Sequence, residues 1–98
     1  MSVQAACEAL KRQRRLELHY DGYIRVVEVH AVGVSKDGND IMRVWQVSGG
    51  SSGNESVGWK LLRVREASAM QILDEKSDAP RDRYRRGDSA MAKIFCEV

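Results

Sequence analysis

Two neighbouring apolar segments carry the aromatic and basic side chains that are best suited to bind a ligand. The first segment contains Arg43 and Trp45, and the second contains Trp59, Lys60 and Arg63. A tryptophan offers a large flat face for stacking, and a guanidinium binds phosphate through a two-pronged fork. This combination suits a ligand that has both a base and a phosphate, namely a nucleotide or a short single-stranded nucleic acid. The residues indicate binding rather than catalysis.

Strand alternation divides this group. Successive side chains of a strand point to opposite faces, so Arg43 and Trp45 share one face. In the second segment Lys60 faces away from Trp59 and Arg63. The five side chains are therefore not all expected in one pocket. The alternative interpretation, that the tryptophans are core residues and the cations cover the rim, stays open at this point.

His30 completes the set of candidate ligand-binding residues. It lies among apolar residues of a β-branched segment, where a histidine is more often a hydrogen-bonded core residue than a ligand contact. Because an imidazole titrates near neutral pH, His30 is also a candidate pH-sensitive contact to an anion. In the same segment, Arg25 and Glu28 are expected to pair across neighbouring strands.

Charge and composition limit the function classes. The chain has 98 residues, enough for one domain, with 43% hydrophobic and 31% charged residues, typical of a soluble globular protein. The formal charge of +2 is low for a protein that binds duplex DNA non-specifically. The basic runs 11–15 and 81–86 are interpreted as solvated faces. Without a long apolar segment, the expected location is cytoplasmic, with no membrane partner.

Catalytic and metal-binding patterns are missing from the sequence. There is no P-loop, no GxGxxG after a strand, and no serine, histidine and acid set in a known motif context. Cys7 and Cys96 lie near opposite ends of the chain and form no CxxC, so we expect two buried free thiols rather than a zinc site. The chain is therefore predicted to be no enzyme and to need no cofactor.

The hydrophobic pattern predicts one mainly β domain over residues 1–98. It begins with a helix in 1–15 and continues with about five strands in 16–73, bent or bulged at Val26–Val27. Hairpin turns are expected at Asp21-Gly22 and at 36–39. Residues 74–98 are predicted to form an irregular arm and a short C-terminal helix, with Met91, Ile94, Phe95 and Val98 on one face. Strands this short indicate a small barrel or a strongly bent sheet.

One series of short segments resembles a WYL domain. In order and spacing, the match covers about residues 5 to 73 and consists of Tyr20-Asp21-Gly22, Arg25-Val26-Val27-Glu28, His30-Ala31-Val32-Gly33, Asp37-Gly38, Arg43-Val44-Trp45 and Gly58-Trp59-Lys60-Leu61-Leu62-Arg63-Val64. The resemblance implies an SH3-like (Sm-like) β-barrel that binds a ligand on a basic, aromatic surface. WYL domains usually accompany the helix-turn-helix of bacterial transcription regulators or nucleic-acid enzymes, and this chain has no room for such a helix-turn-helix.

Two functions follow as expectations. In the first, a stand-alone WYL-like module binds a nucleotide or short single-stranded nucleic acid and senses or sequesters it, as a phage-type sponge for a nucleotide signal would. In the second, the chain is a protein-interaction or homo-oligomerisation module of a bacterial transcription-regulator system. The second has its support in the edge strands of a small barrel and in the apolar C-terminal helix.

Overall fold

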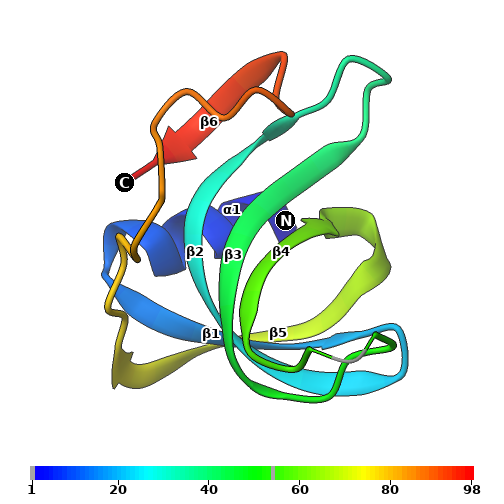
Figure 1. The fold of residues 1–98 in the computed structure, drawn as a ribbon, viewed down its shortest axis with the longest axis vertical. Helices are drawn as coiled ribbons and strands as arrows, with labels where there is room; N and C mark the ends of the chain where they lie inside the picture. The colour runs from blue at the N-terminus through cyan, green and yellow to red at the C-terminus, as the bar shows by residue number, and fades with distance from the viewer. Residues whose placement is uncertain (1, 54) are drawn as a thin grey trace.

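The computed structural model describes residues 2–53 and 55–98 (Figure 1). One helix is followed by four strands, a short 3₁₀ turn and two further strands. Their bounds are α1 Ser2–Lys11, β1 Arg14–Tyr20, β2 Tyr23–Val34, β3 Asp40–Gly49, β4 Gly58–Arg63, η1 Val64–Glu66, β5 Ala67–Lys76 and β6 Lys93–Glu97. Within this part of the chain, no helix is long and apolar enough to cross a membrane.

All six strands belong to one antiparallel, strongly curved sheet. Five of them lie in the order β4-β3-β2-β1-β5, and β6 pairs with the second half of β2. The expected mainly β class is confirmed. The expected closed barrel is not seen, because β4 and β5 are the two ends of the strand order and no pairing joins them in the described part of the chain.

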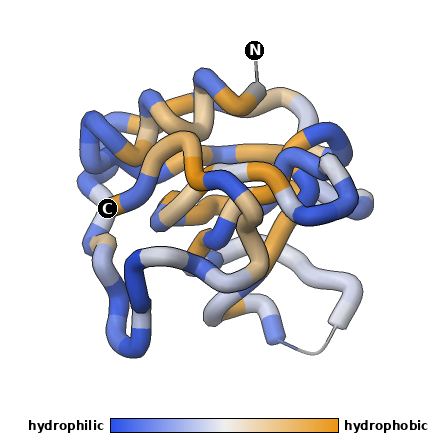
Figure 2. The backbone as a smooth tube through the Cα atoms, turned by 90° about the horizontal axis from the view of Figure 1, so that it is seen from above, coloured by the Kyte–Doolittle hydropathy of each residue, from blue (hydrophilic) through white to orange (hydrophobic). Residues whose placement is uncertain are grey.

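The core lies between α1 and the inner face of the curved sheet. Figure 2 shows the hydrophobic segments gathered in the middle of the molecule. Alternation in the strands places every second residue on this inner face. The buried core residues come from the helix and from all of β1 to β4, and they include Ala6, Ala9, Leu10, Leu16, Leu18, Val27, Val29, Met42, Val44 and Leu62.

Two bulges bend β2 against β3. The first shifts the register between Val26 and Val27, where β3 carries Val47 as its extra residue, so the bulge predicted at this point is confirmed. The second shift lies between Val29 and Ala31, which makes His30 the extra residue of β2. The bends let the first half of β2 pair with β1 and the second half with β6.

The turn chemistry also follows the sequence. Asp21 and Gly22 have φ values of 52° and 81°, the left-handed conformation that a two-residue hairpin between β1 and β2 requires. The turn between β2 and β3 is closed by a hydrogen bond from Ser35 N–H to the Asn39 carbonyl. Both predicted hairpins are confirmed.

The predicted C-terminal helix is wrong. Residues Lys93–Glu97 form β6, which pairs with Ala31–Val34 along an edge of β2. The apolar residues in this segment have helical spacing, but pairing with an unfilled strand edge satisfies the backbone in the extended form instead. In this conformation Met91 is buried, whereas Phe95 is exposed.

The two cysteines are joined, so the expectation of free thiols is also wrong. The Cα atoms of Cys7 and Cys96 lie 5.9 Å apart and their sulfurs form a disulfide between α1 and β6. Sequence reasoning missed the pair because it depends on β6 folding back beside the helix. A bridge that closes so long a loop typically adds about 2–4 kcal/mol to the free energy of unfolding.

Candidate ligand-binding site beneath the C-terminal arm

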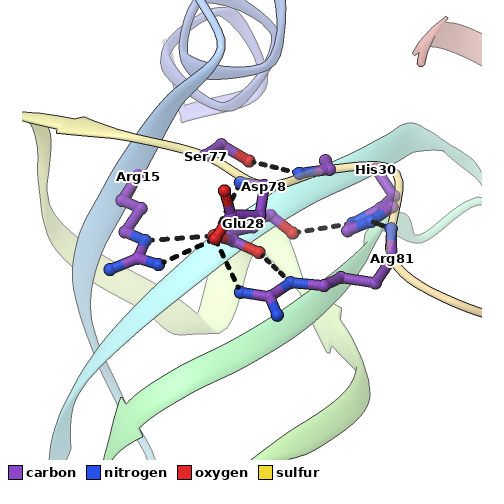
Figure 3. A network of polar contacts seen from close by, with 7 residues as sticks. Arg15, Glu28, His30, Ser77, Asp78 and Arg81 are labelled. Atoms are coloured by element: carbon purple, nitrogen blue, oxygen red, sulfur yellow. Dashed lines mark hydrogen bonds and ion pairs between the residues drawn. The ribbon is translucent and has the colours of Figure 1, made fainter.

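A buried carboxylate on the outer face of β2 holds the segment that completes the site. Glu28 has no exposed surface, although it lies on the side of the sheet that faces away from the core, opposite Trp45 of β3. It is covered by residues 77–89, here called the arm. Figure 3 shows Arg15 of β1 and Arg81 of the arm approaching this carboxylate from two sides.

Each oxygen of the Glu28 carboxylate has a charged partner. Oε1 accepts from Arg81 Nε at 2.6 Å, and Oε2 accepts from Arg15 Nε at 3.0 Å and from the Asp78 backbone N–H at 2.9 Å. Burial by itself would raise the pKa of Glu28. The hydrogen bonds from Arg81, Asp78 and Arg15 outweigh burial and hold the pKa below its ordinary value. The carboxylate is therefore ionised at neutral pH and fixes the arm to the sheet.

His30 provides the second attachment point of the arm. Its Nε2 accepts from the Arg81 backbone N–H at 2.9 Å, so the ring proton lies on Nδ1, which donates to the Glu28 carbonyl at 2.9 Å. Burial lowers the pKa of His30 below its ordinary value of 6.5, and it outweighs the opposing effect of Glu28. The neutral ring is required, because a proton on Nε2 would remove the acceptor for Arg81 N–H.

Aromatic rings pack beneath the arm. The ring of Tyr84 is stacked against Trp59, with 6.1 Å between the centroids and 27° between the ring planes, and its hydroxyl donates to the His30 carbonyl at 3.1 Å. Trp59 in turn contacts Trp45 edge-on at 5.4 Å, since the two residues are direct partners in β3 and β4. The guanidinium of Arg81 lies over the Trp45 ring at 5.4 Å.

A bidentate ion pair closes the far end of the arm. Arg43 of β3 donates from Nε and Nη2 to the two carboxylate oxygens of Asp88, at 2.7 and 3.2 Å. The guanidinium is the main cause that lowers the pKa of Asp88. Asp88 also accepts from the Ala90 N–H, which shapes the turn that leads into β6.

Between the arm and the outer face lies a cavity of about 470 Å³, within the range typical of small-molecule sites. We call it the arm cavity. Aromatic side chains and arginines dominate its lining, which consists of Arg43, Trp59, Arg83, Tyr84, Arg85, Arg86, Gly87, Asp88 and Ser89.

The candidate residues from the sequence fall in different places. Arg43 and Trp59 line the arm cavity. Trp45 lies beside them under Arg81, and His30 is fully buried among the rings as a hydrogen-bonded residue. Arg63 lies at a separate small hollow with Leu61 and Asn39.

Lys60 lies on the opposite face of the sheet, as alternation predicted. It pairs with the core residue Val44 and donates to Ser51 Oγ and to the Glu55 carbonyl. The expected pair between Arg25 and Glu28 is wrong for the same reason, because Arg25 pairs with Leu18 and points to the inner face.

Sequence reasoning missed the contribution of the arm. The run 81–86 was interpreted as a solvated face, whereas Tyr84 packs on Trp59 and three of its arginines line the cavity. The available signal was an aromatic residue inside a basic run, the same combination that singled out β3 and β4.

Comparison of the chain with protein-family models, with curated proteins and with solved structures gives no match. Among residues 2–53 and 55–98, no group of three or more histidine, cysteine or acidic side chains is arranged to hold a metal ion. The proposed function therefore depends on the residues that line the arm cavity.

Replacing Arg81 with Met tests the attachment of the arm. The substitution keeps an unbranched stem but leaves one oxygen of the buried Glu28 without its cation, which we expect to cost about 3 kcal/mol in the free energy of unfolding. The matched control is Arg85→Met on the same arm, expected to change stability by less than about 0.5 kcal/mol. Urea unfolding compares the two, and equal stabilities would contradict the role given to Glu28.

The neutral state of His30 predicts a pH dependence. Because its folded-state pKa lies below 6.5, the unfolded chain binds more protons, so stability falls as pH decreases below 6.5. This window lies above the ordinary pKa values of Glu28 and Asp88, 4.5 and 3.8. Melting temperatures between pH 7.5 and 5.5 should fall for the protein and for His19→Gln, and fall less for His30→Gln. An unchanged slope in His30→Gln would refute the assignment.

Proposed function

We propose that the protein is a non-enzymatic module that binds a nucleotide or a short single-stranded nucleic acid in the arm cavity and thereby senses or sequesters it. One observation carries the proposal. The stacked pair Trp59 and Tyr84 and four arginines line the same cavity. Bases stack on aromatic rings, and arginines bind phosphate oxygens.

The charge balance of the cavity favours an anionic ligand. Four arginines line it against a single acid, Asp88, which is already paired with Arg43. Arg86 pairs with Glu97 of β6. Arg83 and Arg85 form no ion pair with any residue that the structure describes. These two arginines are the ones we assign to phosphate.

The proposal includes a WYL-like origin for the module and a cytoplasmic location. The segments that resemble a WYL domain supply Arg43 and Trp59, whereas Tyr84 and Arg85 belong to the arm beyond that resemblance. Ligand choice would then be a property of the arm rather than of the family pattern. In a reducing cytoplasm the Cys7–Cys96 pair would be a dithiol, and β6 would keep its place through pairing with β2.

The double variant Arg83→Gln/Arg85→Gln tests the site. Neither side chain makes a hydrogen bond or ion pair within the described residues, so we expect the variant to fold normally. Its affinity for nucleotides should fall at least about tenfold, and the salt dependence of binding should weaken with the loss of phosphate contacts. Tryptophan fluorescence titrated with mononucleotides and short oligonucleotides measures both quantities.

The matched control is Arg12→Gln, which removes an exposed cation after α1, away from the cavity lining. It should bind as the unmodified protein does. The proposal fails if the unmodified protein binds no member of the panel. It also fails if the double variant keeps full affinity and salt dependence.

An interaction or homo-oligomerisation module is the second candidate. Its support is now reduced, because the C-terminal helix that would dock on a neighbour is β6 instead. What favours it is the pair of open sheet edges, β4 and β5, with Leu61 of β4 exposed. Edge pairing predicts a dimer or larger oligomer in sedimentation velocity across a range of concentrations. A monomer throughout would remove homo-oligomerisation through these edges.

A further inference from the structure

The small hollow beside Arg63 adjoins the arm cavity on the same face of the sheet. Leu61 follows Trp59 by two residues along β4, so the two side chains point to the same face. Trp59 lines the arm cavity, whereas Leu61 lines the hollow. The chain of the arm continues in the same way, because Ser89 lines the cavity and the next residue, Ala90, lines the hollow. We call this space the Arg63 hollow.

Three successive cross-strand pairs on the outer face of β3 and β4 connect the two spaces. From the cavity towards the hollow, these pairs are Trp45–Trp59, Arg43–Leu61 and Ile41–Arg63. Each pair lies about 7 Å beyond the one before it, since a strand rises about 3.3–3.4 Å per residue. The aromatic rings of the cavity are thus about 7 to 14 Å from the hollow, a distance that one extended ligand spans.

The Arg63 hollow is too small to be a complete ligand site. Its volume is about 220 Å³, below the range of about 300–1,000 Å³ that is typical of small-molecule sites. The arm cavity, at about 470 Å³, lies within that range. Because the two spaces adjoin along β3, β4 and the arm, we interpret the hollow as a subsite. It would hold one part of a ligand whose remainder occupies the arm cavity.

The charges around the Arg63 hollow favour an uncharged part of the ligand. The guanidinium of Arg63 pairs with Glu66 at 3.3 Å, and the carboxylate of Asp37 belongs to the lining. These groups leave no surplus positive charge for a phosphate. Ile41 and Leu61 add an apolar surface to the same lining. A nucleoside has this character, because its base combines an apolar face with polar edges.

The turn between β2 and β3 supplies polar groups that match those edges. Ser35, Asp37 and Asn39 of this turn all line the hollow. The turn is held by hydrogen bonds from Ser35 N–H to the Asn39 carbonyl at 2.9 Å and from Asn39 N–H to Ser35 Oγ at 3.2 Å. Within the described residues, the Asp37 carboxylate and the Asn39 side-chain amide make no hydrogen bond. Such amides and carboxylates bind base edges and ribose hydroxyls.

We propose that the Arg63 hollow binds a second nucleoside, so that the ligand is a dinucleotide unit, alone or within a short single strand, rather than a mononucleotide. The proposal rests on the function assigned to the arm cavity, which takes the first nucleotide. The second nucleoside lies against Leu61, with its polar edge towards Asp37 and Asn39. Arg43 lies between the two spaces, and its Nη1 makes no hydrogen bond within the described chain, so it is left to donate to the linking phosphate.

Isothermal titration with matched ligands tests the second subsite. For each of the four bases, the mononucleotide is compared with the 5′-phosphorylated dinucleotide, for example adenosine monophosphate with pApA. With at least one base the dinucleotide should bind at least about tenfold more tightly, because the second nucleoside is already held next to its subsite. In Leu61→Ala/Asn39→Ala this preference should disappear, while affinity for the mononucleotide stays unchanged. Leu61 is 42% exposed, so Leu61→Ala alone decides if the double variant does not fold.

The matched control is Ile24→Ala, which removes another exposed apolar side chain that lines neither space. It should keep the preference for the dinucleotide. The proposal is overturned if mononucleotides bind and no dinucleotide binds more tightly, or if the double variant keeps the preference. Either result leaves the function of the arm cavity in place. If no member of any pair binds, the proposed function fails and the second subsite fails with it.

Discussion

The structure of the outer face depends on the burial of one carboxylate. Glu28 lies on the side of β2 where a strand would normally meet water, and it is fully covered by the arm. A buried carboxylate is tolerated only with compensating charge and hydrogen bonds, and Arg15, Arg81 and the Asp78 N–H supply them. The same contacts therefore satisfy Glu28 and determine where the arm runs. The remaining attachments of the arm to His30, Trp59 and Arg43 follow along the chain from this point.

The arm turns a sheet surface into a concave site. By themselves, β3 and β4 present Arg43, Trp45 and Trp59 on an open face, which suits contact but encloses nothing. The arm adds Tyr84, stacked against Trp59, and places further arginines around the rings. The Arg43–Asp88 pair holds the end of this segment. The bulge at His30 contributes as well, because the ring receives the Arg81 N–H while its carbonyl receives the Tyr84 hydroxyl.

Local features could be predicted from the sequence, and features that depend on distant partners could not. Alternation correctly separated Lys60 from Trp59 on its own strand, and the left-handed turn at Asp21-Gly22 follows from residue type alone. The helical spacing near the C-terminus was misleading, since the free edge of β2, some sixty residues earlier, decides that β6 is a strand.

The arm shows the same limit on sequence-based prediction at the site. A run of arginines with interleaved acids is ordinarily solvated, and only the buried Glu28, about fifty residues earlier, makes Arg81 an anchor. The disulfide likewise depends on β6 lying beside α1, which neither end of the chain encodes locally. Prediction from sequence thus located half of the candidate site, the half carried by β3 and β4.

The cations on the two faces of the sheet differ in their partners, and β3 contributes residues to both faces. On the outer face, the arginines that hold the arm are neutralised by Glu28 and Asp88, so their charge is used within the protein. On the inner face, Arg25 and Lys60 have only neutral partners in the described chain. Neighbours in a strand point to opposite faces, so Trp45 contacts Arg81 on the outer face and Gln46 contacts Arg25 on the inner face from consecutive positions of β3. Charge that is not neutralised internally is available to a ligand. In the arm cavity that charge lies on the exposed side chains of Arg83 and Arg85, whereas Arg25 is buried at 3% exposure.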